Sequence, residues 1–480
     1  MRRAFMSNVG VMMALNLLIK PFWVLGIDRT VQNILGPENY GMYYNLVAFT
    51  LILSVILEFG INNYTSSQIA KYPDKAPQFF AATFSLKIIY SIAYLIITLS
   101  SALLLNYEGA RLYYLGVLAI CQVMSFFNTY FRSNVSGLHF FKTDSVLSVI
   151  DRILMIAFCS AMIWGNVYPL TLESYIYAQT LSYAIAALCS FLIVKSKIKK
   201  ISFVFDKQIL IQIFKSTYPY ALLAFIMMSY TRVDTILIRQ MLPDGDYQNG
   251  IYSQGYRLLD AGNMMIILIA VILLPMFSRM LQQKENVSNL VDLCMGLMVV
   301  PSIIICCISV VFRSELMNIL YHHSTDLSIQ VFSVTILSFI SFSFMYVFGT
   351  LLTANGSLIL LNKLAFFALI LNVLLNIILI PIYKSLGAAY AAFFTQGFIA
   401  LSNTYFAYKL DELHFNKGLF ARILLYSVVI LIISIVLKSF FLSWVLAAVL
   451  SLSLASILLF TFKIFNLKMS LELLKNKLNA

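Results

Sequence analysis

The chain has 480 residues, of which 61% are hydrophobic and 11% are charged. Because a soluble domain carries about 25% charged residues, this composition excludes an ordinary soluble protein. The apolar runs are continuous and do not alternate in polarity, which excludes an outer-membrane β-barrel. We therefore predict an all-α, polytopic integral membrane protein.

The N-terminal segment MRRAFMSNVGVMMALNLLIK has a basic start and an apolar run, as a secretory signal peptide does. No small-residue cleavage site precedes Lys20 and Pro21, and the apolar character resumes beyond them, so we predict a retained first span. Pro21 leaves a carbonyl one turn back without its helical partner, which predicts a kink in this span.

Apolar runs between polar breaks predict fourteen membrane spans, each of about 20 residues. Their expected starts are Phe5, Gly41, Phe79, Leu112, Val146, Glu173, Tyr218, Gly250, Val291, Val331, Asn362, Gly387, Leu419 and Leu442. The even number places both termini on one side of the membrane.

The distribution of cations predicts which side that is. Of the 33 Lys and Arg, 23 lie on the side of the termini, six lie on the opposite side and four lie inside spans. Because cytoplasmic loops carry the excess of Lys and Arg, both termini are expected in the cytoplasm. The net charge of +13 reflects this bias, so we expect no nucleic-acid partner.

The longest polar interruption, residues 195–217, contains KSKIKK followed by the amphipathic piece DKQILIQIFKS. It is interpreted as a basic cytoplasmic linker whose cations lie near anionic lipid headgroups, with a regulatory role as the alternative. No other loop is long enough to fold as a domain, which argues against membrane-bound glycosyltransferases, polymerases and ligases.

Spans seven and eight, within residues 218–277, each carry two charged residues. These are Arg232 with Asp234 and Arg257 with Asp260. An ionised side chain deep in a membrane helix costs roughly 2.5–3.5 kcal/mol on insertion scales, so such residues usually face a bundle interior or a watery cavity. The four charges predict a polar cavity inside the bundle.

Two turns suggest that the chain contains an internal repeat. ILGPENYGMYY joins spans one and two, and MLPDGDYQNGIYS joins spans seven and eight. Both place Gly-x-Tyr at the start of the next span, as Gly41 with Tyr43 and as Gly250 with Tyr252. The turns occupy equivalent places in a six-plus-six arrangement, and internal repeats are a recurrent transporter design.

Two longer segments resemble a known family. LGPENYGMYYNLVAFTLILSVILEFG, residues 35–60, resembles the opening of polysaccharide-unit flippases, and LNVLLNIILIPIYKSLGAAYAAFFTQ, residues 371–396, is similar to their eleventh and twelfth spans. The family belongs to the multidrug/oligosaccharidyl-lipid/polysaccharide exporter superfamily. The resemblance implies two six-helix lobes in a V shape, residues 1–194 and 218–410, joined by the linker at 195–217. Residues 411–480 would add two C-terminal helices and a basic tail.

The resemblance also implies a function. The expected activity is transfer of a polyprenyl-diphosphate-linked oligosaccharide from the cytoplasmic to the periplasmic leaflet of the bacterial inner membrane, by alternating access and without enzymatic chemistry. Membrane lipids are expected partners, and contact with other polysaccharide assembly proteins is left open. A diphosphate crossing hydrocarbon needs counter-charge and hydration. Arg suits this task because its planar fork donates two parallel hydrogen bonds to phosphate.

Five cations are the candidates for binding this cargo: Arg232, Arg257, Lys20, Lys87 and Arg29. Each has an alternative interpretation. Arg257 and Asp260 share a helix face and could neutralise each other. The lysines could extend to a membrane surface. Arg29, beside Asp28, could be an interfacial anchor.

Three carboxylates are the candidates for binding a coupling ion, Na⁺ or H⁺, because buried carboxylates can titrate near neutral pH. They are Asp234, Asp260 and Glu58, each with a structural salt bridge as the alternative. No other cofactor and no metal site is expected. The six cysteines fall in predicted spans, His322 and His323 lack partners at ligand spacing, and no Walker-type phosphate loop is present.

Other functions remain open at this stage. A multidrug exporter of the same fold would need an acid-dominated cavity, whereas here three cations face two acids in the outer halves of the spans. A peptidoglycan-precursor flippase is a close relative of the preferred interpretation. A membrane-bound enzyme or a scaffold of envelope glycan assembly belongs to a different class.

Overall fold

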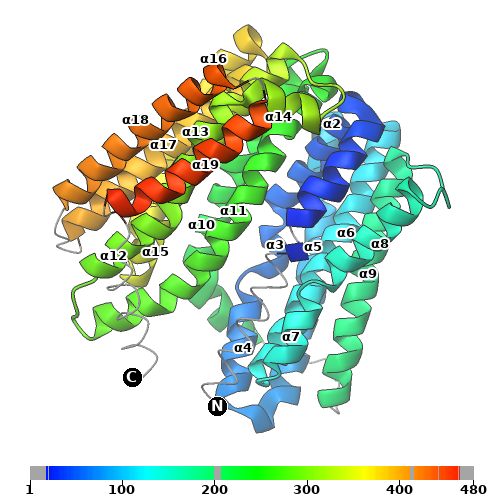
Figure 1. Ribbon diagram of the computed structural model, residues 1–480. Coiled ribbons are helices and arrows are strands. Elements are labelled where there is room, and N and C mark those ends of the chain that lie inside the picture. Colours follow the sequence, from blue (N-terminus) through cyan, green and yellow to red (C-terminus); the bar gives the residue numbers. More distant parts are fainter. Residues whose placement is uncertain are drawn as a thin grey trace. The chain divides into compact units, whose positions relative to one another are not determined.

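The computed structural model describes residues 18–19, 21–198, 207–410, 416–441, 443–462 and 464. Within these residues the chain is helical and contains no strand (Figure 1). Twelve helices are long and apolar enough to cross a membrane, or up to thirteen with the bent pair Trp23–Leu53 and Val55–Lys71. The protein is a multi-pass α-helical membrane protein, and the prediction of about fourteen spans is close. The first predicted span begins at Phe5, outside the described residues.

The chain divides into two compact units, Met1–Gly250 and Ile251–Ala480. The first unit contains η1 (Trp23–Asp28), α2 (Arg29–Leu53), α3 (Val55–Glu58), α4 (Ile61–Lys71), η2 (Pro73–Lys75), α5 (Ala76–Leu104), α6 (Gly109–Gly137), α7 (Phe141–Leu147), α8 (Ile150–Ile163), α9 (Leu172–Lys197) and α10 (Lys207–Met241). The division falls within α11 (Gly245–Gln282), whose first residues belong to the first unit. The two six-helix lobes at 1–194 and 218–410 stay a prediction.

The predicted linker has defined structure at both ends. α9 continues to Lys197, and α10 begins at Lys207. From Lys207 on, the amphipathic piece therefore forms the first turns of α10, which continues through Pro219 into the seventh predicted span. Residues 199–206 of the linker lie outside the described residues.

The first span becomes irregular directly after Pro21, where a kink is expected. Residues Trp23–Asp28 form a π-helix, a geometry that occurs in proteins mostly as a short irregularity within an α-helix. The turn into the second span is made by Gly36 at φ 74° and ψ 169°, followed by Pro37. Glycine tolerates this positive φ at no steric cost, so the second span begins at the turn, a few residues before the expected Gly41.

The second span is broken. α2 ends at Leu53, and the segments Trp23–Leu53 and Val55–Lys71 are bent by 42° relative to each other. α3 is a single turn, and Phe59 and Gly60, both with left-handed backbone, separate it from α4. A break of this kind frees backbone carbonyls and amides, which must find other partners inside a membrane.

The core of the first unit is built around α6, which packs against α4, α5 and α9. Aromatic rings from α5 and α6 interlock there, including Phe80, Phe84, Tyr130 and Phe131. The fully buried Tyr130 hydroxyl lies 2.9 Å from Thr83 Oγ1, which satisfies both groups. α10 packs along α2, so the seventh predicted span is held against the second.

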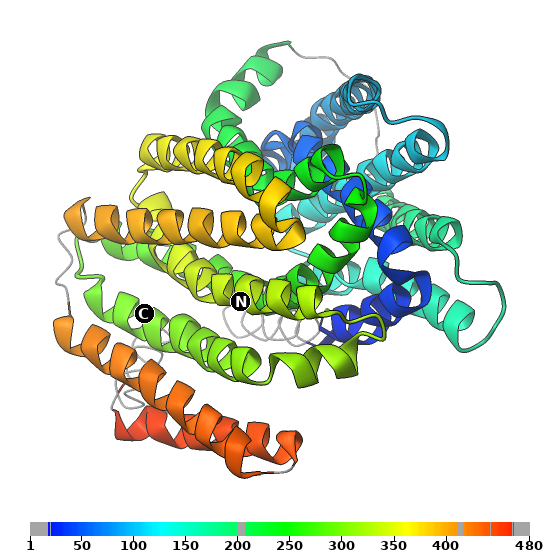
Figure 2. The same cartoon turned by 90° about the horizontal axis from the view of Figure 1, so that it is seen from above.

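In the second unit the described residues form the rest of α11 and eight further α-helices. After α11 come α12 (Ser288–Cys294), η3 (Met295–Val299), α13 (Val300–Val311), α14 (Arg313–Leu320), α15 (Asp326–Ala354), α16 (Leu358–Tyr383), α17 (Ser385–Leu410), α18 (Lys417–Phe440) and α19 (Trp444–Thr461). α17 packs against both α15 and α16. Figure 2 shows α18 and α19, in orange and red, at one edge of this unit, where both contact α13.

Candidate functional site

The two Gly-x-Tyr turns that suggested a repeat lie directly against each other. A Cβ on Gly41 would lie 2.5 Å from the backbone nitrogen of Gly250 and closer still to the carbonyl oxygen of Asp246. A Cβ on Gly250 would lie 2.5 Å from the carbonyl carbon of Pro37. Each glycine thus faces the residue four positions before the other glycine. This reciprocal packing, which we call the α2–α11 contact, is what two equivalent turns related by a local two-fold would produce.

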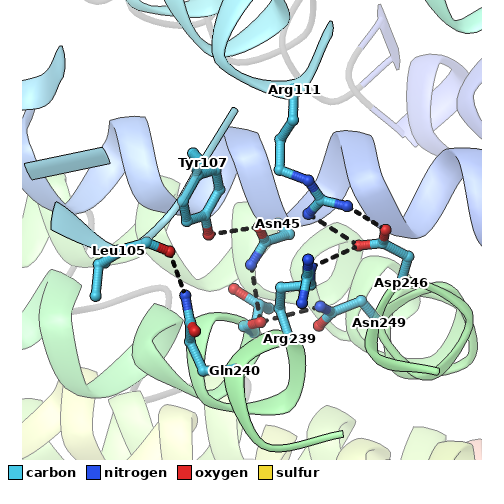
Figure 3. A network of polar contacts seen from close by, with 9 residues as sticks. Asn45, Leu105, Tyr107, Arg111, Arg239, Gln240, Asp246 and Asn249 are labelled. Atoms are coloured by element: carbon cyan, nitrogen blue, oxygen red, sulfur yellow. Dashed lines mark hydrogen bonds and ion pairs between the residues drawn. The ribbon is translucent and has the colours of Figure 1, made fainter. Parts of the chain in front are cut away.

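Amide side chains extend this contact onto α10. Asn45 Nδ2 and Asn249 Nδ2 both donate to the carbonyl oxygen of Thr235, at 2.9 and 3.0 Å (Figure 3). The Tyr107 hydroxyl donates to Asn45 Oδ1 at 2.8 Å and thereby fixes the amide of Asn45. Burial raises the pKa of Tyr107 above its ordinary value, although the Arg111 guanidinium opposes this, so the hydroxyl keeps its proton at neutral pH. The result is a fully buried polar junction of α2, α10 and the start of α11.

Arg232, a candidate cargo residue, lies next to this junction on α10. It is half-buried, and its Nη1 donates to the hydroxyl of the buried Tyr44 at 3.0 Å. Asp234, a candidate for the coupling ion, is fully buried on the same helix. The structure thus places a cation and an acid beside the repeat turn, within the first unit.

A further buried acid in this unit was not among the predicted site residues. Asp28 ends the π-helix and is 1% exposed. Its carboxylate accepts hydrogen bonds from the hydroxyls of Tyr40 and Tyr175, both at 2.9 Å, and from Gln32 at 3.3 Å. The sequence places Asp28 in an apolar run but gives no sign of Tyr175, which is 147 positions away.

Lys87 makes a hydrogen bond to the backbone at the break in the second span. Its ammonium is fully buried and donates to the carbonyl oxygen of Leu57 at 2.5 Å, one of the groups freed by the break. It also lies 5.4 Å from the centre of the Phe126 ring. The side chain therefore does not extend to a membrane surface in this structure. Glu58, the neighbouring acid, accepts a hydrogen bond from Asn62 at 3.1 Å.

The remaining candidates are distributed over the chain. Arg257 and Asp260 are half-buried on α11 in the second unit. Arg29 is half-buried in the first unit, and its buried Nε atom makes no hydrogen bond to any residue that the structure describes. Lys20 lies outside the described residues. The roles of all these residues in cargo or ion binding stay predictions.

Among the described residues, no group of three or more His, Cys, Asp or Glu is placed to hold a metal ion. The six cysteines are free thiols, four of them buried.

These observations define the class of the protein as a polytopic membrane protein with the fold of known transporters. It is similar to a structure titled "Lipid II flippase MurJ, inward closed conformation", with a TM-score of 0.73 at 12% identity over 95% of this chain and 99% of that chain. It is also similar to an inward-facing multidrug resistance MATE family transporter of the MOP superfamily, with a TM-score of 0.61 at 15% identity, covering 83% and 96%. A third similar structure is a MOP superfamily transporter from Pyrococcus furiosus, described as having a binding pocket of reverse polarity. Its TM-score is 0.61 at 14% identity, over 86% of this chain and 96% of that chain.

The family follows from the sequence match. Residues 5–281 match the family model described as "Polysaccharide biosynthesis protein", and the chain belongs to that family. No curated protein matches the chain. The resemblance noted from the two sequence segments is thereby confirmed.

Proposed function

We propose that this protein is a flippase that moves a polyprenyl-diphosphate-linked oligosaccharide from the cytoplasmic to the periplasmic leaflet, for cell-surface polysaccharide export. The observation that carries the proposal is the match to the polysaccharide biosynthesis family over residues 5–281, on a chain with the fold of lipid-precursor and drug transporters. On this account the protein transports a lipid-linked cargo and performs no enzymatic chemistry on it.

The charged residues within the spans support an anionic cargo. Arg232 is half-buried on α10, and its hydrogen bond to the Tyr44 hydroxyl fixes the position of its guanidinium. Arg257 lies half-buried on the following long helix. We propose that these two arginines bind the diphosphate, through the paired hydrogen bonds that suit a guanidinium to phosphate oxygens.

Alternating access requires contacts that form in one state and open in the other. The α2–α11 contact suits this role, because its backbones touch directly through two glycines. We propose that the turns that form it lie on the periplasmic side of the inner membrane and both termini in the cytoplasm, because cytoplasmic loops carry the excess of Lys and Arg. A coupling ion, Na⁺ or H⁺, would bind at Asp234, Asp260 or Glu58.

The test is transport by purified protein in proteoliposomes offered three cargoes. These are a fluorescent polyprenyl-diphosphate oligosaccharide, the same oligosaccharide on a polyprenyl monophosphate, and a lipophilic cationic dye. The proposal predicts transfer of the diphosphate cargo, slower transfer of the monophosphate and none of the dye. Movement of the dye alone would contradict it and indicate a multidrug exporter.

The similarity to a lipid II flippase favours one second candidate, a peptidoglycan-precursor flippase. Its cargo would also be a polyprenyl diphosphate, so the arginines would keep the same role. Competition between the fluorescent oligosaccharide and unlabelled lipid II in the same vesicles separates the two cargoes.

A further inference from the structure

A small pocket opens beside the α2–α11 contact, at the ends of α5, α6 and α10. It has a volume of about 100 Å³ and is lined by Leu105, Asn106, Tyr107, Arg111, Arg239 and Gln240. We call it the arginine pocket. All of these residues belong to the first unit. A water molecule occupies about 30 Å³ in the liquid, so the pocket has room for roughly three waters or for one tetrahedral oxyanion.

Its two arginines share one carboxylate (Figure 3). Arg111 binds Asp246 through both ends of its guanidinium, with Nη1 donating to Oδ1 at 3.2 Å and Nη2 donating to Oδ2. Arg239 approaches the same carboxylate only through Nε, at 3.8 Å from Oδ1. Two guanidinium charges against one carboxylate leave a formal charge of +1 beside the pocket.

Two side chains on the pocket wall, Arg239 and Asn106, have hydrogen-bond donors available to a ligand. The 3.8 Å approach of Arg239 to Asp246 is too long for a hydrogen bond, and the guanidinium of Arg239 makes no hydrogen bond in the described part of the chain. The side-chain amide of Asn106, also on the pocket wall, makes no hydrogen bond to any described residue. Two other polar groups of the pocket already make hydrogen bonds within the protein. Gln240 Nε2 donates to the carbonyl oxygen of Leu105 at 3.0 Å, and the Tyr107 hydroxyl donates to Asn45.

We infer that the arginine pocket is a binding site for a phosphate-class oxyanion, either inorganic phosphate or the phosphate of a lipid headgroup. The rigid guanidinium fork matches tetrahedral oxygens, and the excess charge favours an anion. Because Arg111 lies on α6 and Arg239 in the last turn of α10, a bound anion would bridge the two helices and hold the adjoining α2–α11 contact closed. The site is separate from Arg232 and Arg257 and does not depend on the identity of the transported cargo.

The test measures binding of inorganic phosphate to the full-length protein in detergent, by isothermal titration calorimetry with sulfate-free buffer at constant ionic strength. Arg239→Gln removes the guanidinium that makes no hydrogen bond and should weaken phosphate binding at least about tenfold, since hydrogen bonds to charged groups are the strong ones. Asp246→Asn removes the competing carboxylate and should strengthen binding. Arg313→Gln, which removes an exposed arginine at the start of α14, is the matched control and should bind as the wild type does.

An experiment in nanodiscs distinguishes the two possible sources of the phosphate, a lipid headgroup and free inorganic phosphate. Discs of phosphatidylcholine are compared with discs that contain phosphatidic acid, and lipids retained by the protein are counted by native mass spectrometry. Retention of phosphatidic acid that Arg239→Gln abolishes identifies a headgroup site, whereas calorimetric binding without retention identifies free phosphate.

Two results would overturn the inference. In the first, neither calorimetry nor nanodiscs show any binding of phosphate or phosphatidic acid that Arg239→Gln weakens. The other is weaker binding by a folded Asp246→Asn variant, which would show that the three charged residues form an ion-pair cluster and not an anion site.

Discussion

The α2–α11 contact gives a sharp prediction because two backbones meet there with no room for a side chain. In Gly41→Ala the new methyl group would lie 2.5 Å from the backbone nitrogen of Gly250, whereas ordinary contact begins at 3.4 Å. The carbonyl oxygen of Asp246 would lie closer still, so the two helices must separate by more than about 0.9 Å, the difference between these two distances. Both neighbours are backbone atoms of helices, so neither can rotate away.

The energetic effect follows from the overpacking alone. Overpacking a close contact costs about 1–3 kcal/mol, whereas the roughly 0.5–1 kcal/mol that a helical Gly→Ala replacement returns applies to the open and the closed state alike. The closed contact should lose about 1–3 kcal/mol relative to the open state, which shifts the equilibrium roughly 5–150-fold. Gly250→Ala should act in the same direction, because its methyl group would meet Pro37.

The assay is the rate at which a water-soluble maleimide labels a cysteine placed at Thr235, in a background lacking the six native cysteines. Thr235 is 1% exposed, and its contribution to the contact is its backbone carbonyl, which the substitution keeps. Gly41→Ala should raise the labelling rate in proportion to the open population. Gly116→Ala on α6, where the nearest atom to the new methyl would be 3.8 Å away, should not.

Two outcomes would refute this reasoning. Labelling of Gly41→Ala at the wild-type rate, with the protein folded, would mean that the glycine contact does not control the junction. An equal increase in Gly116→Ala would mean that labelling reports general loosening of the helices.

Two further predictions concern buried charged groups, both measured by thermal unfolding in detergent. Lys87→Met removes the donor to the Leu57 carbonyl and should cost about 1–3 kcal/mol of stability, as expected for a buried acceptor left without a partner. Asp28→Asn replaces a carboxylate that accepts three hydrogen bonds by an amide with a single acceptor oxygen, and should also cost about 1–3 kcal/mol. The exposed positions Lys363→Met and Asp326→Asn are the matched controls. Wild-type stability in either buried variant would refute the role given to that residue.

The sequence predicts the spans well because hydropathy reports directly on burial in a bilayer. It also predicts the equivalence of the turns at Gly41 and Gly250, since both carry the same short motif at corresponding places. Their contact with each other could not be predicted, because hydropathy says which segments cross the membrane and not which of them meet.

The site is predicted less completely for the same reason. Arg232 and Asp234 stand out as charges in an apolar run, and the structure places them beside the repeat turn. The partners of buried polar groups depend on tertiary packing between distant positions, as for Arg111 and Asp246, 135 positions apart. Lys87 illustrates the limit, since its hydrogen bond to a backbone carbonyl exists only because the second span breaks at Phe59 and Gly60.

The central claim is that arginines within the spans carry an anionic lipid-linked cargo across the membrane. The most direct measurement is transfer of a fluorescent polyprenyl-diphosphate oligosaccharide across proteoliposomes by the wild type and by Arg232→Ala and Arg257→Ala. Arg279→Ala is the matched control, because this exposed arginine lies on α11, as Arg257 does, beyond the apolar segment. We predict transfer by the wild type and the control, and a loss of at least about tenfold in the two variants, since hydrogen bonds to charged groups contribute about 1.5–3 kcal/mol each. Unchanged transfer by folded Arg232→Ala and Arg257→Ala would contradict the claim and assign these arginines to structural contacts.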